Sequence, residues 1–472
     1  MNHLNKNLPS TAEAVRVESS LAETYPKDSA FLLPSKNRDY GRQFFSMYQQ
    51  RLAMLKPRVD REATRKWGSN TREVNGKLIQ HKQKILDIVL GELCWVSGTI
   101  FSDMKHKLNI LKDVEKGTDD LMPQPSKKYV DADNEAVVMI EDESGRAILH
   151  NEELLRKSHL VTGCFVGVLG IEIQAGIFEI MEIVNPAPAP QTLALADVDS
   201  SGPEEWLAFV SGLSFGKETD LDPRTLLLLQ WLSGELGGED DVAAAKKILT
   251  LVVVGNSIVE NEHEENLDFT TTNNFGSKNT SKFSPESLTL FGQWLNEIVA
   301  TIPAVVMPGE SDPCEVCLPQ QPVHRALFSQ NAPYVGSKNL VTKSNPTWMQ
   351  TNAGLRILAC AGQNIDDICK YRVGETSLEE TLDIMEQTLR WQVFVPTAPD
   401  TLYCYPYEDS DPFTLDEMPN LYVVGNQCGG GSRTVEIGSS SVKLLSVPAF
   451  KSTGEILLVN TKTLEVKSVL IE

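Results

Sequence analysis

The sequence predicts an α/β fold combined with a β-barrel, in which a small all-β unit comes first and a layered α/β unit follows. Short segments rich in Val, Ile and Phe follow one another between residues 92 and 184, separated by glycines and charged turns, as barrel strands do. Beyond residue 206, apolar segments alternate with helical patterns, which is typical of layered α/β units. A chain of 472 residues has the length for two or three domains.

The composition excludes several classes of protein. The chain carries 64 acidic and 43 basic residues, a net charge of -21, which disfavours DNA binding by bulk charge and favours a basic protein partner. The same acidity also fits a simple role in solubility. The eight cysteines do not indicate a disulfide framework, and Met1–Ser10 lacks the apolar core of a secretory signal. The most apolar run, Leu160–Ile171, is too short to span a bilayer. We therefore expect a protein of the cytosol or nucleus without membrane contact.

The first element is a helix. Residues 1–35 mix charge with Ser and Thr without apolar periodicity, so we expect a disordered N-terminus. Four apolar residues then recur at helical spacing: Phe44, Tyr48, Leu52 and Leu55. Pro57 is expected to end or kink this helix. The basic stretch Lys36–Lys66 is interpreted as a solvated helix face, or as a surface that docks on the acidic part of the chain.

Five strand candidates follow the helix: Leu93–Ser102, Ala136–Glu141, Arg146–Leu149, Val161–Gly170 and Ile177–Val184. Five short strands in about 100 residues fit a small Greek-key barrel such as an OB-fold, with a loop over Lys112–Asn134. Helix and barrel together form an expected first domain, 36–190. The stretch Pro186–Pro190 is stiff and extended. Small and acidic residues follow it, so we expect a linker over 191–205.

The expected second domain covers 206–472. Its strand candidates are Trp206–Ser211, Ile248–Val254, Ala304–Met307, Leu355–Ala361, Leu421–Val424, Val442–Val447 and Glu455–Asn460. Three helices are expected between them, beginning after Asp222, Ser284 and Ser377. The first is expected to stop at Gly237–Gly238, and the third has a capping box formed with Glu380. A polar loop is expected over Asn261–Lys282.

Chemistry in such a fold would lie at the carboxyl ends of the strands. Four of these ends read Val210–Ser214, Val254–Ser257, Met307–Pro313 and Val424–Cys428. Their order resembles the calcineurin-like metallophosphoesterases, whose motifs are Asp-x-His, Gly-Asp, Gly-Asn-His-Asp/Glu and Gly-His-x-His. The resemblance places the metal-ligand positions of that family on Gly212, Ser214, Asn256, Glu310, Ser311, Asn426 and Cys428. The turn glycines of the motifs remain, as Gly255, Gly309 and Gly425.

The residues at these positions do not suit a two-metal centre. Gly212 offers no side chain, Ser214 is a weak neutral ligand, and Asn256 brings no charge to bridge two dications. We therefore predict a degenerate phosphoesterase domain with no catalytic residue, no metal and no cofactor. An active metal-dependent phosphodiesterase or nuclease remains the alternative, and it would bind Mn²⁺ and hydrolyse a phosphodiester.

Eight stretches in the same order resemble the small subunits of replicative DNA polymerases, specifically those of polymerase delta. They are Arg38–Leu55, Leu121–Pro125, Glu141–Arg146, Val210–Leu213, Met307–Glu310, Leu318–His324, Pro396–Leu402 and Val447–Phe450. The resemblance covers the chain from about residue 36 to its end, and it implies an OB domain packed on an inactive phosphoesterase domain. Archaeal relatives in this family keep the metal ligands and are nucleases.

The resemblance also implies a role and partners. It implies a non-catalytic scaffold subunit in DNA replication and repair, located in the nucleus. Such a scaffold binds the C-terminal cysteine-rich domain of the catalytic subunit and a third subunit, which reaches the sliding clamp. In yeasts the same subunit is shared with translesion polymerase zeta. The residues that contact each partner, and the role of the acidic surface, are not readable from the sequence.

Two further features have simpler interpretations. Cys314-x-x-Cys317 would need a second such pair to bind zinc, so we interpret the two cysteines as loop thiols. His324 is interpreted as a structural hydrogen-bonding residue.

A second alternative function is a single-stranded DNA-binding OB-fold protein, which needs exposed aromatics in a basic groove. The candidates are Trp95, Phe101, Phe165 and Phe178 on strands, with Lys105, Lys107, Lys112, Lys127 and Lys128 near loops. Aromatics on strands belong more often to the core, so we expect little direct DNA binding.

Overall fold

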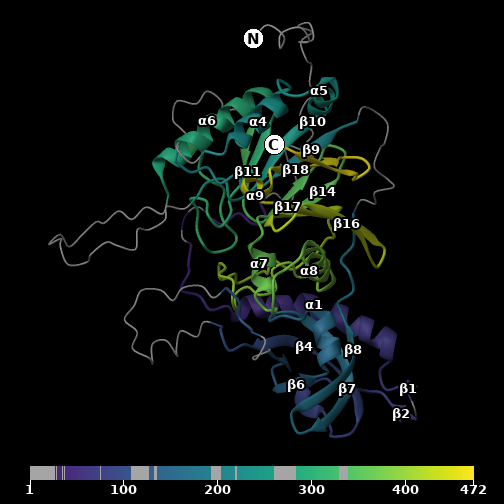
Figure 1. The fold of residues 1–472 in the computed structure, drawn as a ribbon. Helices are drawn as coiled ribbons and strands as arrows, with labels where there is room; N and C mark the ends of the chain where they lie inside the picture. The colour runs from purple at the N-terminus through teal and green to yellow at the C-terminus, as the bar shows by residue number, and fades with distance from the viewer. Residues whose placement is uncertain are drawn as a thin grey trace, which may run out of the picture.

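The structure is a computed structural model, and two folded units meet across one long helix (Figure 1). It describes residues 27, 29–34, 36, 38–74, 76–107, 127–131, 136–192, 204–217, 221–259, 283–328 and 339–472. Several expectations concern residues outside these ranges: Leu121–Pro125, the whole loop 261–282, most of the loop 112–134, most of the linker 191–205, and residues 1–26. None of the described helices is long and apolar enough to cross a membrane.

The long helix α1, Phe45–Trp67, lies between the barrel and the α/β unit (Figure 1). Its fully buried residues are Met47, Arg51, Leu55, Val59, Ala63 and Trp67. This face differs from the predicted one, because Tyr48 and Leu52 are only half-buried. Of the two expected effects of Pro57, the end of the helix is wrong, since α1 continues for ten residues beyond this proline. The free energy gained by burying the apolar residues beyond Pro57 is larger than the cost of the one backbone hydrogen bond that a proline cannot donate.

The first unit is a closed barrel. Its strands are β4 (Leu93–Asp103), β5 (Val137–Glu141), β6 (Arg146–His150), β7 (Phe165–Gln174) and β8 (Ile177–Val184). They follow the order β4-β5-β6-β8-β7, and pairing of β7 with β4 closes the ring. Short elements flank it: β1 (Glu73–Val74), β2 (Lys77–Leu78), β3 (Gln80–His81), the 3-10 turn η1 (Ile85–Asp87) and helix α3 (Glu152–Ser158). The predicted strand Val161–Gly170 begins only at Phe165, because the chain turns at Gly163, where φ is 89°.

The second unit contains two sheets. One has the order β12 (Leu340–Thr342), β11 (Ala304–Met307), β10 (Ile248–Val254), β9 (Trp206–Val210), β18 (Glu455–Asn460) and β19 (Val466–Leu470). The other has the order β13 (Thr347–Gln350), β14 (Arg356–Cys360), β15 (Leu421–Gln427), β17 (Ser440–Pro448) and β16 (Gly431–Ile437). Strands β9 to β12 run parallel, as do β14, β15 and β17.

The two sheets pack face to face through a shared apolar core that includes Phe209, Val252 and Val423. Helices α4 (Pro223–Ser233) and α6 (Pro285–Thr301) cover the outer face of the six-stranded sheet, beside α5 (Glu239–Lys246). Helices α7 (Gln363–Cys369) and α8 (Leu378–Arg390) pack in the core cluster on the other outer face. The short helix α9 (Phe450–Thr453) and the turn η4 (Arg325–Phe328) complete the unit. The mixed sheets and the helices around them agree with the predicted α/β class.

The predicted helix after Asp222 is present, but its predicted end at Gly237–Gly238 is wrong. Helix α4 ends at Ser233, where Gly234 adopts a left-handed conformation with φ of 78°. Gly238, predicted to lie at the helix end, instead precedes α5, which was not predicted. The other two predicted helix starts are confirmed, because the Ser284 side chain accepts from Glu286 N, and Ser377 with Glu380 forms the capping box of α8.

The proline-rich stretch after the barrel does not act as a free spacer. Ala187 and Ala189 are buried, and Ala189 N donates to Gln392 Oε1 at 2.6 Å. Gln191 Nε2 then donates to the carbonyls of Pro419 and Ser441. The stretch is therefore packed along the α/β unit. One core cluster also contains residues of α1, of the barrel and of the α/β unit, so the two units share a continuous apolar interface.

Candidate functional site

The four predicted strand ends meet at one place. Because β9, β10 and β11 are parallel neighbours, their carboxyl ends lie at the same edge of the sheet. Gly212 N donates to Gly255 O at 3.0 Å, and Ser214 N donates to Asn256 O at 3.1 Å. The end of β15 joins from the other sheet, where Asn426 Nδ2 donates to Val254 O at 3.1 Å. The structure thus brings together the positions that the sequence singled out.

The polar side chains at this place bond to backbone groups of the neighbouring strand ends. Asn256 Oδ1 accepts from Ser311 N at 3.2 Å, and Ser311 Oγ donates to Ile258 O at 2.7 Å. Asn426 Nδ2 also donates to Ala361 O at 2.7 Å, while Asn426 N donates to Ser211 Oγ at 2.8 Å. These contacts use the amides and hydroxyls to hold the strand ends in place.

Close packing fills the space that a larger side chain would need at Gly212. A β-carbon there would lie 2.8 Å from Ala449 Cβ and 3.0 Å from Asn426 Oδ1. The φ of Gly212 is +60°, which also disfavours any side chain. At Gly309 a β-carbon would lie 2.2 Å from Asn256 Oδ1. The position that would carry the first metal-binding carboxylate of the phosphoesterase motif is therefore closed to an aspartate.

Asp312 is a buried carboxylate beside these positions. Its Oδ1 accepts from Ser257 N at 2.8 Å and Ile258 N at 3.1 Å, and its Oδ2 accepts from Gly309 N at 2.8 Å. Burial raises the pKa of Asp312 to about 6, while the backbone N–H donors act to lower it. Because its lone pairs face three backbone donors, this carboxylate ties the end of β10 to the loop after β11.

Glu310 and Cys428 are both exposed, and Cys428 Sγ lies 3.8 Å from Thr381 Oγ1 of α8. Within the described ranges, no group of three or more His, Cys, Asp or Glu residues is placed to hold a metal ion. A two-metal centre needs a bridging carboxylate and several imidazoles. The donors present at these strand ends are amides, hydroxyls, one thiol, the exposed carboxylate of Glu310 and the buried carboxylate of Asp312. Because the Asp312 carboxylate already accepts from three backbone N–H groups, this set does not fit such a centre.

The Cys314-x-x-Cys317 motif lies in the loop that follows β11. The Sγ atom of Cys314 is 3.6 Å from Gly309 O, and Gln320 Nε2 donates to this sulfur at 3.0 Å. Burial raises the pKa of both thiols, which keeps them protonated. His324 Nδ1 accepts from Ala326 N at 3.2 Å, a local contact at the start of η4.

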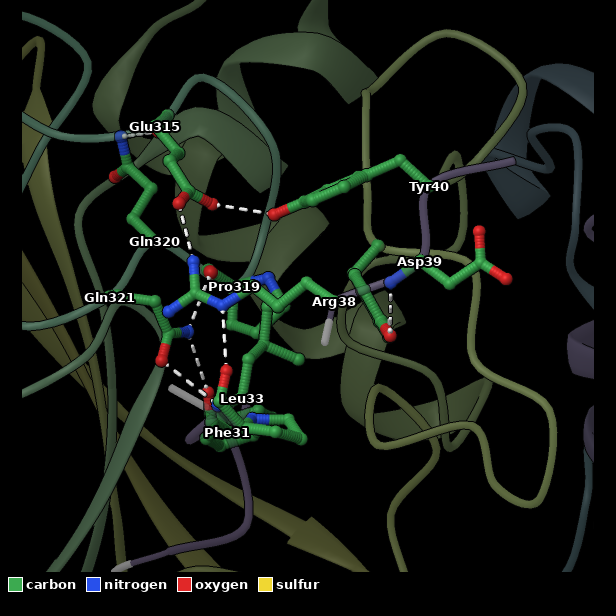
Figure 2. A network of polar contacts seen from close by, with 11 residues as sticks. Phe31, Leu33, Arg38, Asp39, Tyr40, Glu315, Pro319, Gln320 and Gln321 are labelled. Atoms are coloured by element: carbon green, nitrogen blue, oxygen red, sulfur yellow. Dashed lines mark hydrogen bonds and ion pairs between the residues drawn. The ribbon is translucent and has the colours of Figure 1, made fainter. Parts of the chain in front are cut away.

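The same loop contacts an N-terminal arm, which consists of the described residues 29–34, 36 and 38–40 (Figure 2). Tyr40 donates from its hydroxyl to Glu315 Oε2 at 2.8 Å, and Arg38 pairs with Glu315 Oε1 at 2.5 Å. Leu33 N donates to Gln321 Oε1 at 2.9 Å, and Gln321 Nε2 returns a bond to Phe31 O at 3.0 Å. The arm therefore crosses the loop that follows one of the degenerate strand ends.

Phe31 anchors the arm in the α/β unit. Its side chain is only 1% exposed, and its ring centroid lies 6.0 Å from that of Phe394 and 6.5 Å from that of Phe413. Residues 29–34 lie within the segment 1–35 that was expected to be disordered, and this part of the expectation is not met. The sequence signal was the short apolar run Ala30–Leu33, which is too short to show a helical or strand periodicity.

The charges on the barrel do not resemble those of a DNA-binding groove. Three of the four aromatic candidates, Trp95, Phe165 and Phe178, are buried in the core. The fourth, Phe101, lies under the Arg146 guanidinium, which is itself paired with Glu141 at 2.7 Å. Lys107 pairs with Asp400 of the α/β unit. These cations are already matched by carboxylates. Lys112 lies outside the described residues.

Two family models match the chain. A model described as the OB-fold domain of a DNA polymerase delta subunit matches residues 43–183. A model described as the B-type subunit of DNA polymerases alpha and epsilon matches residues 207–430. The first match confirms the OB-fold predicted for the barrel.

Curated relatives match over nearly the whole chain. The DNA polymerase delta small subunit of Saccharomyces cerevisiae is 37% identical, over 99% of this chain and 97% of the relative. The DNA polymerase delta small subunit of rice, Oryza sativa subsp. japonica, is 32% identical, over 81% and 84%. The DNA polymerase delta subunit 2 of Drosophila melanogaster is 31% identical, over 95% and 97%. These matches confirm the resemblance found in the eight sequence stretches.

Proposed function

Since this chain belongs to the family of DNA polymerase delta small subunits, we propose that it is a non-catalytic scaffold on which the other subunits of the polymerase assemble. Membership in the family makes it an accessory subunit of a DNA polymerase complex that acts in replication. In the proposal it bridges the C-terminal cysteine-rich domain of the catalytic subunit to the third subunit, which in turn reaches the sliding clamp. Its place of action is the nucleus.

The observation that carries the non-catalytic part is the packing around Gly212. An active phosphoesterase would place a metal-binding carboxylate there. Here Ala449 and Asn426 occupy the space that the side chain would need. This supports assigning residues 206–472 to a degenerate calcineurin-like phosphoesterase domain, in which the strand ends serve the fold alone. Residues 36–190 form the OB-fold domain with its helix in the same proposal.

The scaffold part rests on the rigid connection between the two units. A scaffold must hold two partners at a fixed geometry. Helix α1, the packed stretch Pro186–Pro190 and one shared apolar cluster join the barrel to the α/β unit. With both units fixed, the catalytic subunit can occupy one surface while the third subunit occupies another. Specific interfaces need roughly 800 Å² per partner, and a chain with 24505 Å² of accessible surface accommodates two.

Reconstitution tests the proposal directly. The catalytic subunit and the third subunit are mixed with and without this chain, and the complexes are separated by size-exclusion chromatography. We expect a three-subunit complex only when this chain is present, together with a gain in clamp-dependent processive synthesis. If the third subunit joins the catalytic subunit equally well without this chain, the scaffold proposal fails. The same experiment with the catalytic subunit of polymerase zeta tests the proposed sharing with translesion synthesis.

A further inference from the structure

A groove of about 830 Å³ runs beside α1 on the barrel, from Phe45 to Asp60. Its apolar surface is formed by Phe45, Tyr48 and Leu52 of α1 together with Phe101 of the barrel, and the buried Phe165 lies beneath it. These residues lie apart from the degenerate strand ends and from the N-terminal arm. The groove therefore belongs to neither feature described above.

Both ends of the groove expose large apolar side chains. Phe45 is 67% exposed at the start of α1. Leu86 is 73% exposed at the other end, where Leu86 N donates to Ser144 Oγ beside the groove residue Glu143. Exposing such side chains costs free energy in water and contributes nothing to the fold. A hollow apolar surface flanked by exposed apolar residues is typical of a protein-binding site.

The charges around the groove indicate the chemistry of the partner. Five carboxylates line it, Asp60, Glu141, Asp142, Glu143 and Asp400, against three cations, Lys56, Lys84 and Arg146. Each of these cations pairs with a lining carboxylate, at 3.6 Å for Lys56 with Asp60, 3.3 Å for Lys84 with Glu143 and 2.7 Å for Arg146 with Glu141. Asp400 pairs with Lys107, whose Nζ lies over the ring of the groove residue Phe101, and Asp142 accepts from Ile85 N and from Ser144 Oγ. The groove therefore carries one carboxylate more than it has cations beside it, so its rim complements Lys and Arg on a partner and repels phosphates.

The shape of the groove favours a helix as its occupant. Phe45 and Asp60 both line it, so it follows α1 for about 22 Å at 1.5 Å per residue, or about four helical turns. An extended peptide would need a free strand edge. Strand β4 pairs with β5 and β7, and β5 pairs with β4 and β6, so these strands offer none along the groove. A helix needs only apolar side chains at i, i+3, i+4 and i+7.

We propose that this groove binds an amphipathic helix of another polymerase subunit, with its apolar face between Phe45 and Phe101 and with Lys or Arg along its flanks. The inference rests on the proposed scaffold function and assigns one of its two docking surfaces. It places that surface on the OB-fold domain and α1, and leaves the α/β unit for the second partner.

The test uses the full chain with two charge-introducing variants, Phe45→Glu and Leu86→Glu. Both positions are exposed, so the fold is retained, and thermal unfolding verifies this. Leu226→Glu, at a 51% exposed position on α4, is the matched control. Isothermal titration calorimetry measures the affinity for the C-terminal domain of the catalytic subunit and for the third subunit separately. We expect both groove variants to weaken the same one of these partners at least tenfold, and the control to bind both like the wild type.

The outcomes separate this inference from the scaffold proposal. If wild type and both groove variants bind each partner within twofold of one another, the groove is not a docking surface, and the scaffold proposal stands. If the wild type binds neither partner, the scaffold proposal fails and the inference falls with it. A labelled single-stranded oligonucleotide serves as the competing probe. Binding of this oligonucleotide by the wild type and its loss in Phe45→Glu would assign the groove to nucleic acid and overturn the helix.

Discussion

The guanidinium of Arg51 donates from Nε to Oδ2 of Asp411 at 2.6 Å, and both side chains are buried. Arg51 belongs to α1, and Asp411 belongs to the α/β unit. The same guanidinium also donates to Gly163 O of the barrel unit and to the carbonyls of Pro396 and Ala398. One side chain thus connects α1 with both folded units, which is the physical basis for treating them as one rigid body.

Replacing Arg51 should therefore loosen the whole molecule. In Arg51→Met the Asp411 carboxylate stays buried without its cation, and such losses typically cost about 3–5 kcal/mol. Urea unfolding should show this decrease in the free energy of unfolding. Arg65→Met, at a 73% exposed site paired with Glu62, should change it by less than about 0.5 kcal/mol. Equal effects of the two substitutions would mean that the buried pair does not hold the units together.

A second prediction concerns the closed space at Gly212. Gly176→Ala is the control, because Gly176 also has a positive φ, +79°, but has nothing within 4 Å of the added β-carbon. The control should lose about 1 kcal/mol of stability from backbone strain alone. Gly212→Ala should lose about 1–3 kcal/mol more, since it also pushes against Ala449. Thermal unfolding measures both, and similar losses would show that the space is open.

The third prediction restores two phosphoesterase ligands with Gly212→Asp and Ser214→His. We expect this double variant to be destabilised and to bind no stoichiometric pair of metal ions, because the residues that would complete and orient the ligand set are absent. Metal content after equilibration with Mn²⁺ is the measurement. The wild type should likewise show no chelator-sensitive hydrolysis of a phosphodiester. Two bound metals in the double variant would show that the site is less degraded than its packing indicates.

The N-terminal arm should contribute measurably to stability. Phe31→Ala removes a ring that packs between Phe394 and Phe413, and we expect a loss of about 3–5 kcal/mol. The neighbouring Leu32→Ala, at a 47% exposed position, should cost less than about 1 kcal/mol. Differential scanning fluorimetry distinguishes them by the shift in Tm. An unchanged Tm in Phe31→Ala would mean that the arm is not held in solution.

Asp312 should make stability depend on pH. Its pKa in the folded chain is about 6, above the ordinary value near 3.9, so the folded state binds a proton that the unfolded state has lost. This group therefore contributes stability below about pH 4 that is lost as the pH rises to about 6, by roughly 3 kcal/mol. The difference in unfolding free energy between wild type and Asp312→Asn should fall over that window. If the difference in unfolding free energy between the two proteins stays constant from pH 4 to pH 7, the predicted role of Asp312 is wrong.

Much of this protein could be predicted from local sequence patterns. The strands Ile248–Val254, Ala304–Met307 and Glu455–Asn460 have the limits that their apolar runs predicted. The capping box of Ser377 with Glu380 could also be predicted from the sequence, because its two residues are only three positions apart. The residue types at the positions that carry metal ligands in phosphoesterases, such as Gly212 and Asn256, are also given directly by the sequence, because they do not depend on the fold.

Contacts between distant residues were decided only by the tertiary structure. Helix α1 runs through Pro57 because Val59, Ala63 and Trp67 find an apolar surface on the barrel. Phe31 is ordered by rings more than 350 positions away in the chain. Asp312 joins two segments of the chain, since its carboxylate accepts from Ser257 N and Ile258 N after β10 and from Gly309 N after β11. The sequence by itself therefore determined many of the periodic elements, the family and the residue types at the four strand ends. The packing of the arm and of α1 against the two units depends on contacts between residues that are far apart in the chain, and no local sequence pattern shows such contacts.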